Sequence, residues 1–210
     1  MGKIKIILFD IDGVLIRLPY YFSRELTLMG YDYAENCLDD FFHSDSYSEC
    51  LQGKKNVKVS IAPYLEKSGW KGTIDDYLAQ QFKFEIKYLD RDMLSIIKSL
   101  KVHGVKCLLS TDQEKVRCQY LLGEAGLGEI FDGNFVSSEI GFRKYQDGFW
   151  ENVIKRLREE NEDVETKEIA FFDDKQRNID VAQKFGIRAF LFKNTSEFKR
   201  DIDFLKLRVD

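Results

Sequence analysis

The sequence has few of the residues on which many metal and nucleophile sites depend. Its 210 residues include two histidines, His43 and His103, and four cysteines, at positions 37, 50, 107 and 118. None of the cysteines forms a CxxC pair, which excludes zinc ribbons and thioredoxin-type redox motifs. Two histidines exclude a histidine-rich metal site, and without a G-x-S-x-G motif a Ser-His-Asp triad is not expected. Any chemistry must therefore rest on carboxylates, hydroxyls and lysines.

Long apolar runs and a strong net charge are also lacking. The apolar stretches, such as IILF at 6–9, are only a few residues long, so no segment could span a bilayer. A net charge of −4 argues against a general binder of nucleic-acid phosphates. An acidic residue follows too early for a signal peptide, and free thiols suit a reducing compartment, so we expect a cytoplasmic protein. Apolar residues at 44% and aromatic residues at 14% indicate a folded chain with a sizeable core.

Short apolar runs alternate with amphipathic segments along most of the chain. The apolar runs predict buried strands at 3–10, 105–112, 168–174 and 187–192. The amphipathic segments predict helices at 90–102, 113–125, 146–161, 175–185 and 196–210. Strands that alternate with helices predict an α/β fold, in which helices cover both faces of a parallel sheet.

Residues 16–88 break this alternation. They are rich in aromatic side chains, contain both prolines and have helical patterns without strands between them. We expect a helical insert at 16–88, between the two parts of the core at 1–15 and 89–210.

Polar residues follow three of the predicted strands: Asp10 and Asp12, the run 110–112, and Asp173 with Asp174. Open parallel sheets bind ligands at the carboxyl ends of their strands, so these side chains are expected to converge. Converging carboxylates repel one another unless a cation offsets their charge, and oxygen ligands favour Mg²⁺. A bound Mg²⁺ would in turn attract and orient a phosphate.

Each of these residues also has an ordinary structural interpretation. An acid after a strand is often a helix cap, and Ser110 and Thr111 fit an N-cap equally well. Lys144 taken alone fits a solvated surface lysine. Their joint order along the chain is what favours a functional site.

That order resembles the haloacid dehalogenase-like hydrolase superfamily over nearly the whole chain. LFDIDGVL at 8–15 matches the first motif, LLSTD at 108–112 the second, SSEIGFRK at 137–144 the third, and FFDDKQRNIDVAQKFGI at 171–187 the fourth. One departure is Tyr145, where the family usually has proline after the lysine. The change removes a helix-starting restraint beside Lys144, and Arg143 offers a rival cation.

The resemblance implies a Rossmann-like core and a Mg²⁺-dependent phosphatase that forms an aspartyl-phosphate. Asp10 is then the nucleophile, and Asp12 donates a proton to the leaving alcohol and later takes one from water. Asp12 also separates the chain from the dehalogenase branch, which lacks this second Asp. The implied metal ligands are Asp10, the Asp12 backbone carbonyl and Asp173; the implied phosphate-binding residues are Ser110, Thr111 and Lys144. Asp174 is either a further metal-shell carboxylate or an orienter of Lys144.

The insert corresponds in this family to a small helical cap of the C1 type, as in subfamily I. Residues 53–70 are similar to caps of bacterial sugar-phosphate phosphatases and of the phosphatase domain of soluble epoxide hydrolase. The implied substrate is a small phosphorylated metabolite, a sugar phosphate first, with no nucleic-acid or membrane partner, and the chain is expected to be a monomer or homodimer. Candidate specificity residues are Arg17, Tyr20, Tyr21 and Lys54.

Three other functions are compatible with parts of this pattern. A phosphomutase of the same superfamily would use the same residues but would shield the aspartyl-phosphate from water. A phosphoacceptor regulatory module also groups Asp, Thr and Lys at strand ends, but its acidic pair comes first, whereas residues 173–174 come last here. A non-catalytic protein with this fold would be expected to have lost at least one of the implied catalytic and metal-binding residues. All of them are present: Asp10, Asp12, Ser110, Lys144 and Asp173.

Overall fold

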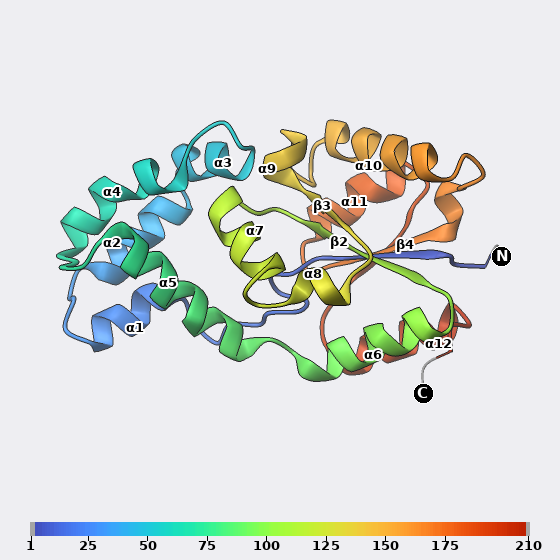
Figure 1. Cartoon of the computed structure of the whole chain (residues 1–210), viewed down its shortest axis with the longest axis horizontal. Helices are drawn as coiled ribbons and strands as arrows, with labels where there is room; N and C mark the ends of the chain where they lie inside the picture. Colours follow the sequence, from blue (N-terminus) through green and yellow to red (C-terminus); the bar gives the residue numbers. More distant parts are fainter. Residues whose placement is uncertain (1–2, 209–210) are drawn as a thin grey trace.

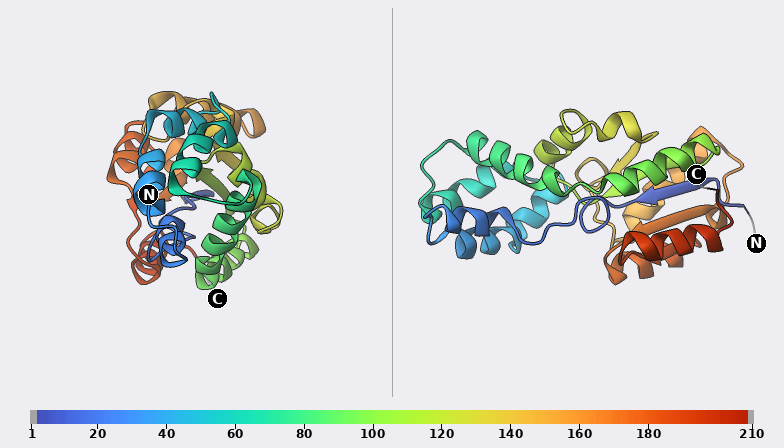
Figure 2. Two further views of the ribbon diagram at one scale, coloured as in Figure 1. Left: turned by 90° about the vertical axis from the view of Figure 1, so that its left-hand side faces the viewer. Right: turned by 90° about the horizontal axis from the view of Figure 1, so that it is seen from below.

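The protein has two parts that lie at opposite ends of its long axis (Figures 1 and 2). The computed structural model describes residues 3–208. One part is built around a sheet, and the other is a group of helices formed by the predicted insert. The outermost residues of the predicted core, 1–2 and 209–210, lie outside the described residues.

The sheet contains five parallel strands in the order β3-β2-β1-β4-β5. In chain order the strands are β1 (Ile6–Phe9), β2 (Lys106–Thr111), β3 (Asn134–Val136), β4 (Ile169–Asp173) and β5 (Arg188–Leu191). The α/β prediction and the four predicted strands are confirmed. β3 was not predicted, because three residues are too short for a recognisable apolar run.

Helices cover both faces of the sheet, as predicted. In the core they are α6 (Arg91–Val102), α7 (Lys115–Leu122), α8 (Leu127–Ile130), α9 (Ser137–Ile140), α10 (Asp147–Glu160), α11 (Gln176–Lys184) and α12 (Thr195–Phe204), with the 3-10 turn η2 (Thr166–Glu168). A second 3-10 turn, η1 (Ile86–Tyr88), lies at the end of the insert just before α6. Side chains alternate across β1, so Ile7 and Phe9 pack with α6 and α12 while Ile6 and Leu8 pack with α10 and α11. Because both faces are buried, the strand is apolar at every position.

The insert forms five helices between β1 and α6, with an apolar cluster of its own. They are α1 (Phe22–Leu28), α2 (Ala34–Phe42), α3 (Asp45–Leu51), α4 (Val57–Ser68) and α5 (Ile74–Glu85). Aromatic rings account for much of this cluster; Phe41, for example, lies 5.2 Å from the Tyr64 ring between centroids. Among the described residues, none of the helices has the length and apolar character needed to cross a membrane.

The insert touches the core beside the carboxyl ends of the strands. The Ser137 hydroxyl donates to the Leu51 carbonyl at 2.6 Å, and a Cβ on Gly53 would lie 2.2 Å from the Ser138 carbonyl oxygen. Gly53 therefore allows the two backbones to approach closely. This contact places the helices of the insert over the edge of the sheet where the polar residues were predicted to converge.

Candidate active site

The carboxyl ends of β1, β2 and β4 meet at one edge of the sheet. Phe9 pairs with Leu109 on one side and with Phe172 on the other, so the residues that follow are brought into line. The amide of Asp10 donates to the Phe172 carbonyl at 3.0 Å, which places Asp10 next to Asp173. Neighbouring parallel strands thus unite residues that are far apart in the chain.

Lys144 lies between the two buried carboxylates. Its Nζ is 2.6 Å from Asp10 Oδ1 and 2.6 Å from Asp173 Oδ2, and the residue is 1% exposed. Burial disfavours the charged ammonium, but the charges of Asp10 and Asp173 raise the pKa of Lys144 above its ordinary value. Lys144 is therefore a charged buried lysine and not a solvated one.

The predicted rival, Arg143, is directed elsewhere. Its Nε donates to Asp112 Oδ2 at 2.8 Å, and its guanidinium lies 5.3 Å from the centre of the Tyr145 ring. The Lys144 backbone is held from two sides, because its amide donates to Asp112 Oδ1 and its carbonyl accepts from Trp150 Nε1. These contacts orient Lys144 without the proline restraint that Tyr145 replaces.

Three carboxylates are grouped closely enough to hold a metal ion. Asp10, Asp173 and Asp174 each offer an oxygen within 4.8 Å of the others. Burial raises the pKa of Asp10 well above its ordinary value; Lys144 lowers it in part, and Asp173 raises it further. One ammonium therefore does not fully offset the buried negative charge. An oxygen-only set with surplus charge fits a hard divalent cation such as Mg²⁺.

The two residues of the acidic pair have different surroundings. Asp173 is buried and accepts from the Lys175 amide at 2.8 Å and from Asn178 Nδ2 at 3.0 Å. Asp174 is less buried, and its ion pair is with Lys175 at 2.8 Å. Among the described residues the ion pairs of Lys144 are with Asp10 and Asp173. This geometry favours Asp174 as an additional carboxylate of the metal group over an orienter of Lys144.

Asp12, which also lines the cavity between core and insert, is held by a set of hydrogen-bond donors. Arg117 donates to both of its oxygens, at 2.7 and 2.8 Å, and Gln113 Nε2 donates to Oδ2 at 2.6 Å. Burial among protein atoms raises the pKa of Asp12, but the Arg117 charge and these hydrogen bonds more than offset that effect and leave the pKa below its ordinary value. Half of the side-chain surface still faces the cavity.

Arg117 and Gln113 were not identified from the sequence. Both lie at or just before α7, directly after the second motif, and Arg117 is buried although it carries a charge. The available signal was an arginine within an otherwise largely apolar stretch of the helix.

Ser110 and Thr111 are fully buried at the end of β2. The Ser110 hydroxyl has no hydrogen-bond partner among the described residues, and neither side chain lines the cavity. A buried hydroxyl without a partner is costly unless a bound group satisfies it, which is compatible with a phosphate ligand for Ser110. The phosphate-binding roles of Ser110 and Thr111 stay predictions.

A cavity of about 720 Å³ lies between the core and the insert, over Asp10, Asp12 and Lys144. The core contributes mainly charged groups to its wall, among them Asp10, Asp12, Asp174, Arg143 and Lys144. The insert contributes mainly aromatic and apolar groups, among them Tyr20, Phe22, Phe42, Tyr47 and Leu51. The cavity therefore has a polar floor and a largely apolar cover.

Three of the four candidate specificity residues line this cavity. Tyr20 and Tyr21 do so directly, and Arg17, also part of the wall, forms an ion pair with Asp90. Lys54 is not among the lining residues; its ammonium donates to Gln52 Oε1 at 2.8 Å.

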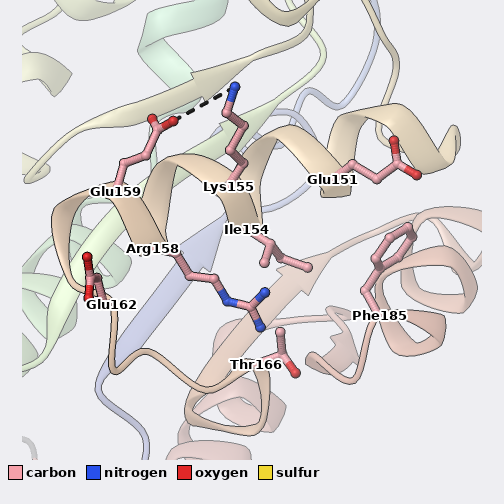
Figure 3. A pocket seen from close by; sticks show the side chains of 8 residues that line it. All are labelled: Glu151, Ile154, Lys155, Arg158, Glu159, Glu162, Thr166 and Phe185. Atoms are coloured by element: carbon pink, nitrogen blue, oxygen red, sulfur yellow. Dashed lines mark ion pairs between the residues drawn. The ribbon is translucent and has the colours of Figure 1, made fainter.

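A second depression lies along α10, beside η2 and the end of α11 (Figure 3). Its lining residues are Glu151, Ile154, Lys155, Arg158, Glu159, Glu162, Thr166 and Phe185. The Lys155–Glu159 pair is 3.8 Å apart, and both side chains are more than half exposed. These charges are typical of the solvated face of a helix, and the depression contains none of the strand-end residues.

Gly13 is required where the loop after β1 passes Asp174. Its φ is +81°, and a Cβ there would lie 2.3 Å from Asp174 Cγ. We expect Gly13→Ala to lower the free energy of unfolding by more than the about 1–2 kcal/mol typical of a left-handed residue, and to weaken cation binding by displacing Asp174. Denaturant unfolding and calorimetric titration with Mg²⁺ measure the two effects.

The matched control is Gly69→Ala, because Gly69 has a similar φ of +78° but no atom within 4 Å of the Cβ position. In that variant the free energy of unfolding should fall only by the cost of a left-handed backbone conformation, and Mg²⁺ should bind as in wild type. Equal losses in the two variants would show that the Asp174 contact has no effect.

Comparison with known proteins gives a consistent family assignment. Residues 4–186 match the family of haloacid dehalogenase-like hydrolases. The chain is 32% identical over 188 residues to the sesquiterpene phosphatase astK of Aspergillus oryzae (strain ATCC 42149 / RIB 40), covering 87% of each protein. It is also 33% identical over 104 residues to the drimenol cyclase drtB of Aspergillus calidoustus, which covers 50% of this chain but only 18% of that protein.

Solved structures share the fold at lower sequence identity. A haloacid dehalogenase family enzyme from Bacteroides thetaiotaomicron superimposes with a TM-score of 0.76 and 18% identity, covering 96% of this chain and 99% of that one. The same enzyme in complex with magnesium and inorganic phosphate gives a TM-score of 0.70 at 18% identity, covering 93% and 98%.

Proposed function

This chain belongs to the haloacid dehalogenase-like hydrolase family, and from that membership we propose that it is a Mg²⁺-dependent phosphatase acting on a phosphomonoester of a small metabolite. The observation that carries the proposal is the group formed by Asp10, Asp12 and Lys144 on the floor of a covered cavity, with Asp173 buried against Lys144. Hydrolysis of a phosphate ester needs a nucleophile, a proton-transfer group and positive charge near phosphorus.

In the proposed mechanism Asp10 attacks phosphorus in line and forms an aspartyl-phosphate while the alcohol leaves. Asp12 supplies the proton for the leaving oxygen and then accepts one from the attacking water. Lys144 stabilises negative charge on Asp10 and on the phosphoryl oxygens, and Ser110 donates a hydrogen bond to the phosphoryl group. Asp10, Asp173, Asp174 and the Asp12 carbonyl would hold Mg²⁺, which supplies charge stabilisation at the phosphoryl oxygens.

The insert is proposed to act as the cap of this site. Its helices cover the cavity, and the Ser137–Leu51 hydrogen bond ties it to the core. A covered cavity excludes water during the attack and admits a small substrate only.

Two substrate classes are candidates for the cavity. A sugar phosphate follows from the similarity of residues 53–70 to caps of sugar-phosphate phosphatases. A phosphate ester of an apolar alcohol, such as an isoprenoid, is favoured by the aromatic cover that includes Phe42 and Tyr47, and a relative is named a sesquiterpene phosphatase. The aromatic part of the cover would bury a hydrocarbon chain, whereas Asp39, His43 and Gln81, which the insert also contributes to the wall, offer hydrogen-bond partners for sugar hydroxyls.

Removal of Mg²⁺ tests the activity directly. Phosphate release should be measured for hexose phosphates, nucleoside monophosphates and a prenyl monophosphate, with Mg²⁺ or with a chelator. We expect the rate of phosphate release to fall by about 10²- to 10⁴-fold when Mg²⁺ is removed, because several kcal/mol of charge stabilisation are lost. Mg²⁺ added back should restore the rate.

Other outcomes would identify the alternatives. Hexose 6-phosphate formed from hexose 1-phosphate without free phosphate would indicate a phosphomutase. Mg²⁺ binding without release from any substrate would refute the phosphatase on this panel and favour a phosphoacceptor role.

A further inference from the structure

Arg117 donates two hydrogen bonds to the Asp12 carboxylate. It lies on α7 and is 6% exposed. Its Nη2 donates to Asp12 Oδ1 at 2.7 Å and its Nη1 to Asp12 Oδ2 at 2.8 Å. Two parallel hydrogen bonds from one planar guanidinium fix the plane of the carboxylate as well as its position.

The guanidinium is itself held on its other edge. Nε donates to Glu85 Oε2 at 2.6 Å, and Nη1 also donates to Gln113 Oε1 at 2.6 Å. Glu85 is buried at the end of α5, and its second oxygen accepts from Gln81 Nε2 at 2.8 Å. Burial acts to lower the pKa of Arg117, but the Asp12 and Glu85 charges raise it well above its usual value. The side chain therefore stays charged and in one orientation.

Gln113 closes the network on the side of the second motif. It accepts from Arg117 and donates to Asp12 Oδ2 at 2.6 Å, so it links both members of the pair. Asp12 is the one carboxylate of this network with half of its side-chain surface accessible from the cavity. The network therefore orients Asp12, its most exposed carboxylate, at the wall of the cavity that Asp10 also lines, while Glu85 stays largely buried.

Arg117 could in principle bind the substrate phosphate, but its contacts argue against that role. Both terminal nitrogens already donate to Asp12, and Nε donates to Glu85. The positive charge that contacts Asp10 is Lys144, at 2.6 Å. Arg117 consequently acts on the reaction through Asp12.

We propose that Arg117, held by Glu85, is the positioning residue that orients the Asp12 carboxylate for hydrolysis of the aspartyl-phosphate. This role rests on the proposed function. In that step a water oxygen attacks phosphorus, the bond between phosphorus and the Asp10 oxygen breaks, and Asp10 leaves as a carboxylate. The water proton passes to Asp12, which must therefore point at the water. A displacement of about 1 Å in such a group costs on the order of 10²-fold in rate.

The first and second steps can be separated with p-nitrophenyl phosphate. Its leaving group departs as a stable anion with the electron pair of the broken P–O bond, so formation of the aspartyl-phosphate needs little help from Asp12. A variant in which Asp12 is misoriented should therefore form the intermediate normally and hydrolyse it slowly.

The test is rapid mixing of p-nitrophenyl phosphate with wild type and Arg117→Lys in the presence of Mg²⁺. The lysine keeps the charge but cannot form two parallel hydrogen bonds. We expect a burst close to one nitrophenolate per enzyme, then a steady rate about 10²-fold below wild type. Both kcat and KM should fall, while kcat/KM, which reports the first step, stays near the wild-type value.

Glu85→Gln keeps an acceptor for Arg117 Nε and provides a milder variant in case Arg117→Lys folds poorly. It should show the same burst with a smaller fall in kcat. Arg158→Gln, on the exposed face of α10 (Figure 3), is the control and should match wild type.

The results distinguish failure of the positioning role from failure of the proposed function. A proportional loss of kcat and kcat/KM without a burst in Arg117→Lys and Glu85→Gln would mean that the network is merely structural, and would overturn the positioning role. Wild-type enzyme that turns over no aryl or metabolite phosphate with Mg²⁺ would overturn the proposed function itself, and the positioning role with it.

Discussion

Asp10→Asn is expected to abolish phosphate release. The amide cannot act as the nucleophile, so no aspartyl-phosphate forms, and loss of such a group costs on the order of 10⁴- to 10⁶-fold in kcat. The measurement is phosphate release with Mg²⁺ for the substrate that wild type hydrolyses fastest, together with a denaturant unfolding curve.

The folded state should survive this substitution. Burial raises the pKa of Asp10, which means that its ionised form is disfavoured where it lies. Asn has the same shape and no charge, and Lys144 keeps Asp173 as a partner at 2.6 Å. We therefore expect little loss in the free energy of unfolding.

A matched control separates the nucleophile from a general effect of removing a carboxylate. Asp203 is an exposed residue of α12, on a helix that packs on the sheet and contributes nothing to the cavity wall. Asp203→Asn should retain wild-type activity. Substantial turnover by Asp10→Asn would show that Asp10 is not the nucleophile, whatever its effect on stability.

Lys144→Met is expected to have the largest effect on stability. It leaves Asp10 and Asp173 buried side by side without the ammonium that lies 2.6 Å from each. Removing one partner of a buried ion pair costs about 3–5 kcal/mol, because the remaining charge is uncompensated. Denaturant unfolding in the presence of a chelator measures this loss, and phosphate release should be lost as well.

Mg²⁺ should recover part of the stability of this variant. The cation would bind the same carboxylates, and a ligand that binds only the folded state stabilises it by mass action. We expect Mg²⁺ to raise the midpoint of unfolding more in Lys144→Met than in wild type, because the two carboxylates no longer have Lys144 as a counter-charge.

The control for this variant is Lys155→Met on α10. Lys155 is 73% exposed and 3.8 Å from Glu159, so its loss should change the free energy of unfolding by less than about 1 kcal/mol. A Lys144→Met protein as stable as wild type without Mg²⁺, or with a midpoint of unfolding that Mg²⁺ does not change, would show that Lys144 does not offset the charges of Asp10 and Asp173.

Local patterns were sufficient to predict four of the five strands and the polar residues at the carboxyl ends of three of them. An apolar run that ends in polar residues identifies a buried parallel strand and its carboxyl end, and hydrogen bonding then aligns those ends. Asp10 and Asp173 could therefore be expected to meet before the geometry was known. The short strand β3 was missed because Asn134–Val136 is too brief to show a period.

The surroundings of Asp12 could not be obtained in this way. Arg117 lies 105 positions from Asp12 and 32 from Glu85, on a helix whose sequence shows which side is apolar but not what that side will contact. Asp174 likewise has the same local pattern as Asp173, and only the tertiary structure shows that Asp173 is buried against Lys144 while Asp174 lies beside Gly13 and pairs with Lys175.

The sequence by itself thus indicates the reaction class, because its motifs lie at the ends of strands that pair with one another in the sheet. Packing between segments with no shared local pattern decides the rest. It determines the partners of Asp12, the contact of Lys144 instead of Arg143 with Asp10, and the aromatic cover of the cavity. Strand pairing is encoded by short-range periodicity, whereas contacts between helices and loops depend on how the whole chain buries its apolar faces.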